Sequence, residues 1–265
     1  MPANSGTGNS LEHYSRLLPM VEANTTFYGI PSEATVARWR EQTPPSFRFC
    51  LKFPRSISHD KQLVDCGVEL DEWLSRLTEL GEQGGPSFLQ LPPDFGPWRF
   101  QDLSNFLALI PRSVAVSVEA RHIGWFQKPV EDDLNALLTE LGVGRILYDV
   151  RPLRAAAGRD ALTDAALAKK PRSPVRVVAT SSHVHIRYIA FPGIDENDQW
   201  LSQWAPKVAD MVREGRDVYF CMHSIFDEHM PRLCRRFHDM MATRIPLEPL
   251  PSSAELIDNG QMSLF

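Results

Sequence analysis

The chain has 265 residues, of which 43% are apolar and 23% charged, so it can bury a sizeable core in one large domain or two small ones. Its formal net charge of −5 argues against a protein whose whole surface binds polyanions. The sequence has no run of 18 apolar residues, and its first ten residues lack a basic and an apolar region, so we expect neither a transmembrane helix nor a signal peptide.

Strand-like and helix-like stretches alternate along the chain. Among the helix-like stretches, residues 32–43 open with a serine cap, whereas residues 131–144 and 198–217 have amphipathic spacing and include a closing glycine. This alternation predicts βαβ units and a parallel sheet. The strand-like runs cover residues 19–25, 47–53, 86–92, 114–120, 145–151, 183–189 and 217–223. No glycine-rich phosphate fingerprint follows the first run, which argues against a dinucleotide-binding fold.

Almost every strand-like run carries a charged or amide residue at its carboxyl end. Gathering such side chains from many strands at one face is typical of a (β/α) barrel, whose pocket opens at that face. These residues are Glu22, Asn24, Lys52, Gln90, Glu119, Arg121, Asp149, Arg151, Arg187 and His223. A closed barrel needs eight strands, and only seven runs are found. The missing strand should precede the helix-like segment near residues 11–19, but the first ten residues are too polar to be a buried strand.

Several motifs resemble those of the YecE-like family, also called domain of unknown function 72. They are "VEANTTFYGIP", "FRFCLKFPRSISHD", "LQLPPDFGP", "VSVEARHIGWF" and "LYDVRP", in the family's order. The resemblance implies a TIM-like barrel but gives no reaction. Family members usually open with a strand and an "IGxxxW" segment, which is absent here. We therefore expect a TIM-like barrel that lacks its first strand because the start was assigned too late or the chain was truncated.

The expected organisation is a single barrel domain over residues 1–250, with residues 1–10 disordered and a tail over residues 251–265. The four cysteines form no C-x-x-C pair, which favours reduced, buried thiols and a cytoplasmic location.

The charged residues at the strand ends suggest a site for an anionic ligand. Glu22, Glu119, Asp149 and His223 are the candidate catalytic groups, because carboxylates beside a histidine can transfer protons. Cations on the same rim suit a phosphate or carboxylate group. The candidate binding residues are Asn24, Lys52, His59, Gln90, Arg121, Arg151 and Arg187. The alternative is a network of salt bridges that only caps the core.

No cofactor can be named from the sequence. A divalent cation held by carboxylate oxygens is one alternative, but no metal-ligand motif supports it. His183 and His185 share a strand face with Arg187, and a cation on that face disfavours a second one. We therefore predict no metal site.

Residues 151–176 carry seven Lys or Arg residues against two Asp residues. As a βα connection, this stretch should rise on the same face as the site. It is interpreted either as a solvated helical excursion or as an electropositive lid that attracts an anion, including nucleic acid. It has no aromatic residue, which argues against a stacking platform for single strands.

The chain ends in "QMSLF", residues 261–265, after a proline- and serine-containing spacer. This pentapeptide resembles the motif that binds the bacterial DNA sliding clamp, with Gln261, Leu264 and Phe265 as the contact residues. The alternative is that Leu264 and Phe265 fold back onto the barrel. Three functions stay open: an enzyme acting on a phosphate-bearing or nucleic-acid-derived substrate, a hydrolase or isomerase of a small sugar-like metabolite, and a non-catalytic adaptor that binds an anion.

Overall fold

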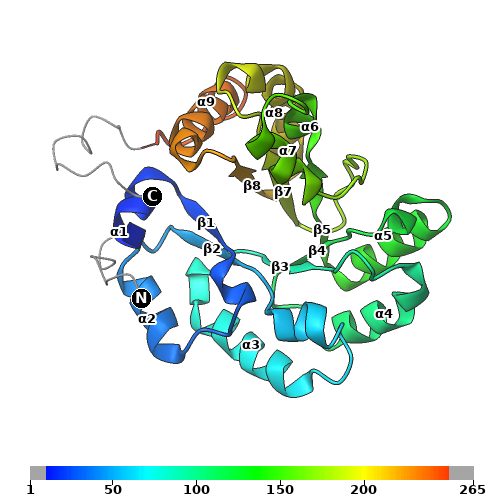
Figure 1. Ribbon diagram of the computed structural model, residues 1–265. Helices are drawn as coiled ribbons and strands as arrows, with labels where there is room; N and C mark the ends of the chain where they lie inside the picture. Colours follow the sequence, from blue (N-terminus) through cyan, green and yellow to red (C-terminus); the bar gives the residue numbers. More distant parts are fainter. Residues whose placement is uncertain (1–9, 251–265) are drawn as a thin grey trace.

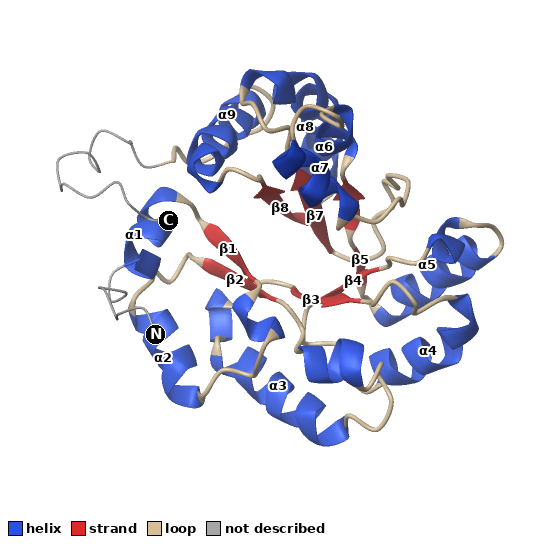
Figure 2. Ribbon diagram, in the orientation of Figure 1, coloured by secondary structure: helices blue, strands red, loops and turns tan. Residues whose placement is uncertain are grey.

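The computed structural model describes residues 10–250 and shows a mixed α/β fold in which helices surround a series of parallel strands (Figures 1 and 2). The strands are β1 (Met20–Ala23), β2 (Arg48–Leu51), β3 (Ser87–Gln90), β4 (Val116–Glu119), β5 (Gly144–Arg145), β6 (Leu147–Asp149), β7 (His183–Ile189) and β8 (Asp217–His223). The helices are α1 (Ser10–Leu17), α2 (Glu33–Glu41), α3 (Gly67–Glu79), α4 (Phe100–Ala108), α5 (Val130–Leu141), α6 (Arg151–Ala155), α7 (Ala161–Ala168), α8 (Asp198–Arg213) and α9 (Met230–Ala242).

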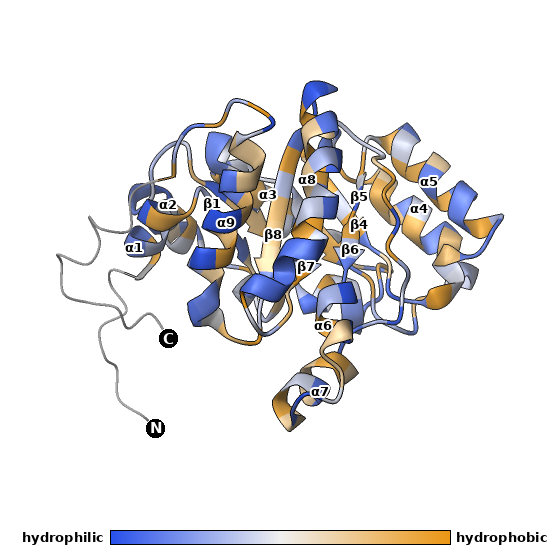
Figure 3. Cartoon of the chain, turned by 90° about the horizontal axis from the view of Figure 1, so that it is seen from above, coloured by the Kyte–Doolittle hydropathy of each residue, from blue (hydrophilic) through white to orange (hydrophobic). Residues whose placement is uncertain are grey.

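The local signals act as expected at two helix ends. The Ser32 hydroxyl accepts a hydrogen bond from the backbone N–H of Thr35, which caps α2. Gly142 ends α5 with a φ of 69°, a left-handed conformation that favours glycine. Figure 3 shows that the helices carry both hydrophilic and hydrophobic residues, as expected for helices with one face against the sheet.

The strands follow one another in chain order, and every paired strand is parallel. The pairs are β1–β2, β3–β4, β4–β5, β6–β7 and β7–β8. Bridges from Phe49 to Gly84 and from Lys52 to Phe88 link β2 to β3, and β5 is separated from β6 by Ile146 alone. The prediction of a parallel α/β fold is therefore confirmed.

The strands do not close into a barrel. Within residues 10–250, β8 and β1 are not paired, so an interruption lies where the sequence predicted one. A cleft of about 510 Å³ occupies this position, lined mainly by apolar side chains of α1, β1, β8 and α9. Figure 2 shows β1 and β8 apart, with no strand drawn between them. The expectations for residues 1–9 and for the tail 251–265 fall outside the described residues.

Backbone groups of β1 point toward the cleft. The carbonyl groups of Pro19 and Ala23 accept hydrogen bonds from the backbone of Arg48 and Lys52 beside β1. Since successive residues of a strand alternate, the backbone N–H and C=O groups of Met20 and Glu22 face away from β2, toward the cleft. Within residues 10–250 these groups of β1 have no partner strand, so backbone polar groups as well as apolar side chains edge the cleft.

Two further sequence expectations can be compared with the structure. All four cysteines are free thiols. No helix within residues 10–250 is both long and apolar enough to cross a lipid bilayer.

The close approach of β2 and β3 gives a prediction for stability. A Cβ atom on Gly85 would lie 2.9 Å from Sγ of Cys50 and 3.3 Å from the carbonyl oxygen of Phe49. We expect Gly85→Ala to lower the free energy of unfolding by about 1–3 kcal/mol through overpacking. Gly29, whose Cβ would meet nothing within 4 Å, supplies the control Gly29→Ala. Urea unfolding of both variants checks this, and equal stabilities would contradict it.

Candidate functional site

A buried arginine lies at the centre of the residues that the strand ends bring together. The Arg187 side chain on β7 is 7% exposed, and its Nε and Nη2 donate to the two carboxylate oxygens of Glu22 at 2.8 and 2.7 Å. Its Nη1 donates to Oε2 of Glu119. Arg187 on β7 therefore links the end of β1 to the end of β4.

A second arginine extends this network. Nε of Arg121 donates to Oε1 of Glu119, and its Nη2 donates to Oε1 of Gln90 at 3.0 Å. The Tyr148 ring lies beneath both guanidinium groups, with its centroid 5.4 Å from Cζ of Arg121 and 5.9 Å from Cζ of Arg187. Together these contacts fix both guanidinium planes against one aromatic surface.

The arginines keep both carboxyl groups ionised. Burial would raise the pKa of Glu119, but Arg121 and Arg187 lower it to about 2. Burial opposes ionisation of Glu22 too, yet Arg187 and then His223 hold the pKa of Glu22 well below its usual range. Each carboxylate thus carries a full negative charge at neutral pH.

Lys52 differs from the arginines because no carboxylate binds it. The residue is 9% exposed, and its Nζ lies 4.1 Å from the centre of the Phe27 ring. Its ammonium group makes no hydrogen bond or ion pair with any residue that the structure describes. Burial, followed by the charge of Arg187, lowers the pKa of Lys52 to about 8, although Glu119 opposes this. A buried cation without a partner costs stability, which makes Lys52 a candidate for ligand binding.

Two further groups lie near Lys52. His59, on the helical turn η2 (Ser56–Asp60), meets the Phe27 ring edge-on with a centroid distance of 4.9 Å. Burial and then the charge of Lys52 lower the pKa of His59 to about 4, so the imidazole is neutral at physiological pH. Burial and then the charges of Arg187 and Arg121 lower the pKa of Lys170, which places this residue of the basic stretch within electrostatic range of the site.

His223 and Asn24 complete the cluster at the Glu22 side. Nε2 of His223 lies 3.3 Å from Oε1 of Glu22, and Nδ2 of Asn24 donates to the same oxygen at 3.3 Å. Both residues also line the cleft between β1 and β8. The carboxylate and imidazole therefore form a pair that could transfer a proton at the edge of the cleft.

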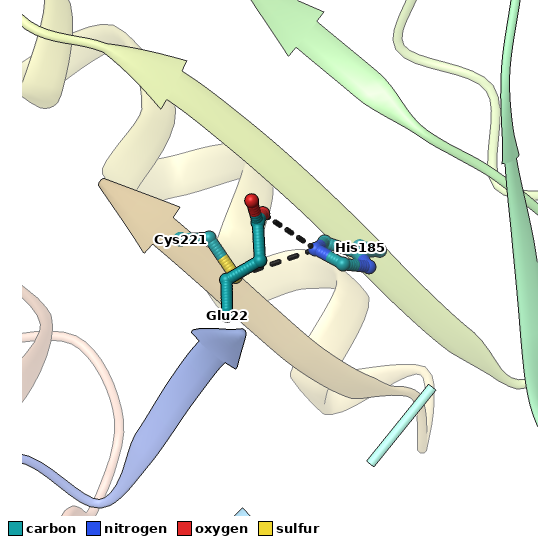
Figure 4. A group of neighbouring side chains, drawn as sticks. All are labelled: Glu22, His185 and Cys221. Atoms are coloured by element: carbon teal, nitrogen blue, oxygen red, sulfur yellow. Dashed lines mark hydrogen bonds and ion pairs between the residues drawn. The ribbon is translucent and has the colours of Figure 1, made fainter. Parts of the chain in front are cut away.

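Glu22 also belongs to the one group with metal-ligand geometry identified within residues 10–250. Its carboxylate, Nε2 of His185 and Sγ of Cys221 lie within 4.8 Å of one another (Figure 4). However, Glu22 already receives two hydrogen bonds from Arg187, and a metal ion would compete with that guanidinium. A hydrogen bond with Cys50, together with burial, raises the pKa of the Cys221 thiol, so the sulfur is protonated and a poor ligand. This arrangement disfavours a metal.

Asp149 and Arg151 do not join the cluster. Asp149 is fully buried and binds the Arg151 guanidinium at 2.7 and 2.9 Å and the indole N–H of Trp204 at 2.8 Å. Side chains alternate along β6, so Tyr148 points toward the site and Asp149 points toward α8. Asp149 and Arg151 thus pair with each other outside the cluster, and this geometry gives no support to the prediction that Asp149 is catalytic and Arg151 binds substrate.

The sequence analysis missed three contributors. Tyr148 precedes the conspicuous Asp149 on a strand that is buried on both faces, so the sequence could not tell which of the two faces the site. Phe27 lies in the loop after β1, where no periodic signal applies. Lys170 stood within the basic stretch but was not distinguished from its other cations.

The two buried carboxylates give a prediction for pH dependence. Their pKa values are lower in the folded protein than in the unfolded chain, so their stabilisation is complete above about pH 4.3 and is lost as the pH falls toward 2. We expect the urea midpoint to fall steeply between these limits. Glu119→Gln should flatten the fall, and Glu140→Gln, at an exposed site, should not. An unchanged slope in Glu119→Gln would contradict this.

Comparison with known proteins identifies the family of this chain. The model of the family "Protein of unknown function DUF72" matches residues 1–255. The chain is 36% identical over 238 residues to the UPF0759 protein YecE of Escherichia coli strain K12, covering 89% of this chain and 87% of that protein.

Two solved structures are similar in fold. A DUF72 family protein from Enterococcus faecalis V583 superimposes with a TM-score of 0.68 at 19% identity, covering 90% of this chain and 94% of that one. Another, from Thermotoga maritima MSB8, gives a TM-score of 0.65 at 19% identity, covering 91% and 92%. The fold and the sequence agree, and the chain belongs to the DUF72 family.

Proposed function

We propose that this protein is an enzyme that acts on a small molecule carrying a phosphate or carboxylate group, bound at the carboxyl ends of β2, β3 and β4. The observation that carries the proposal is the Lys52 ammonium, which is buried and has no carboxylate partner among the described residues. An anionic ligand would supply the missing charge.

The charges around Lys52 support an anion rather than a cation. Two carboxylates, those of Glu22 and Glu119, lie among four cationic side chains. These cations are Lys52, Arg121, Lys170 and Arg187. Arg187 is occupied by both carboxylates, whereas Arg121 is 13% exposed and binds only one of them. Lys52 and Arg121 are therefore the groups with donors left for a ligand.

The surroundings of the anion site contain groups suited to acid–base chemistry. His59 is neutral at physiological pH, and Nε2 of His223 lies 3.3 Å from the Glu22 carboxylate. The pKa of Lys52, about 8, lies close to physiological pH, where a general acid or base works best. A purely structural salt-bridge network would not need an unpaired lysine.

We expect inorganic phosphate and pyrophosphate to bind in a calorimetric titration. Lys52→Met or Arg121→Met should weaken binding about tenfold to a hundredfold, the loss of one charge-assisted hydrogen bond. Lys52→Met should not lower stability, because it removes a buried, unpaired cation. Lys128→Met, which breaks only an exposed pair with Asp132, is the matched control. Equal binding by Lys52→Met and the control would refute the proposal.

Recruitment to a sliding clamp is a second proposal, carried by the terminal "QMSLF". Leu264 and Phe265 would enter an apolar pocket of the clamp while Gln261 makes polar contacts. A role near DNA would then make a nucleic-acid-derived substrate the favoured anion.

The basic stretch adds little to direct nucleic-acid binding, because several of its arginines are engaged. Arg151 pairs with Asp149, Arg176 with Glu131, and Arg154 donates to the carbonyl oxygen of Pro171. Lys170 is the residue of this stretch that supports the lid interpretation, since burial and then the charges of Arg187 and Arg121 lower its pKa.

Replacing both Leu264 and Phe265 by Ala should abolish binding to a bacterial sliding clamp in a titration, since loss of a buried aromatic anchor commonly costs about 2 kcal/mol or more. The melting temperature should stay nearly unchanged. Met262→Ala, at the variable position of the motif, serves as the control and should bind normally. A large loss of stability without clamp binding in the wild type would show that the tail packs on its own domain.

A further inference from the structure

We propose that Lys52 forms a reversible imine with a short aldehyde or ketone that carries a phosphate group. This inference rests on the proposed function, because it names the substrate class of the same site. It assigns to the lysine a covalent role in addition to charge pairing.

The amine of Lys52 is isolated from the other polar groups of the described residues. Imine formation needs a lysine nitrogen whose lone pair is free and whose approach is open. Nζ of Lys52 is held only by the face of the Phe27 ring, at 4.1 Å, and makes no hydrogen bond or ion pair within the described chain. Although the residue is largely buried, Nζ is not among the side-chain atoms cut off from solvent. Nζ therefore keeps some contact with solvent.

The amine of Lys52 is also more easily deprotonated than that of an exposed lysine. The pKa of Lys52, lowered to about 8 by burial and by Arg187, leaves a substantial fraction of neutral amine near physiological pH. An exposed lysine with a pKa of about 10.4 has roughly a thousandth of its amine neutral at pH 7.4. Arg121, whose charge also lowers this pKa, is the neighbouring cation with a donor left for the phosphate.

Other cationic side chains lie within electrostatic range of Lys52. Arg121 projects from the end of β4, and its charge, like that of Arg187, acts on Lys52 and on Lys170. A phosphate bound by Arg121 and Lys170 would bring a carbonyl two or three bonds away toward the amine. A carbonyl compound without the anionic group would lose this orientation.

The step balances without a further reagent. The neutral amine adds to the carbonyl carbon, and one proton moves from nitrogen to oxygen to give a carbinolamine. The C–O bond then breaks, and the hydroxide leaves as water with the second proton of the nitrogen while the C=N bond forms. Hydrolysis reverses the sequence.

The experiment traps the imine by reduction. The full chain is incubated with glycolaldehyde phosphate and sodium cyanoborohydride, and the alkylated lysines are located by peptide mass spectrometry. We expect Lys52 to be labelled at least tenfold faster than Lys128, with a rate that reaches half its maximum near pH 8. Glycolaldehyde without phosphate should lose most of this preference, and so should Arg121→Met. Lys52→Arg, which keeps the charge but has no nucleophilic amine, should abolish the labelling.

The outcomes separate the two proposals. If phosphate binds in the titration but Lys52 is labelled no faster than Lys128, the imine is wrong and the anion site stands. If phosphate does not bind and labelling shows no preference for the phosphorylated aldehyde, both proposals fail. Labelling of Lys52 with an ordinary lysine pH profile would also overturn the inference, because the amine would then not be activated.

Discussion

The pairing of Arg187 with Glu22 and Glu119 is the interaction on which the site depends. Burying three charges is costly, and the cost is offset only when every donor and acceptor is matched. Here one guanidinium binds two carboxylates from strands far apart in the chain, and Arg121 takes up the remaining oxygen of Glu119. The carboxyl ends of β1, β4 and β7 are thereby locked to one another, which fixes the charges that surround Lys52.

These ion pairs explain why Lys52 has no carboxylate partner among the described residues. Both nearby carboxylates already have arginine partners, so neither is free to neutralise a third cation. The result is a local excess of positive charge in a partly dry environment, which lowers the pKa of Lys52 and favours an incoming anion. The proposed anion binding and the proposed reactivity of the amine would then have a common physical origin.

Much of this site could be predicted from the sequence because parallel strands end on one side. Glu22, Lys52, Gln90, Glu119 and Arg187 were identified from their positions at or near strand ends, and the structure brings them together. Asp149 failed because a strand covered on both faces gives no sign of which residues point inward. Tyr148 and Phe27 carry no charge and so gave no signal, although their rings support the cations.

The interruption between β1 and β8 gives Glu22 a mechanical part as well as an electrostatic one. The backbone does not join these strands, but the Glu22 carboxylate reaches from β1 to Arg187 on β7 and to His223 on β8. The first and last strands of the series are therefore linked through the side chain of Glu22. A ligand that draws Glu22 away from Arg187 would break this link. Occupancy of the site would then change the width of the cleft between β1 and β8 and the exposure of its apolar lining.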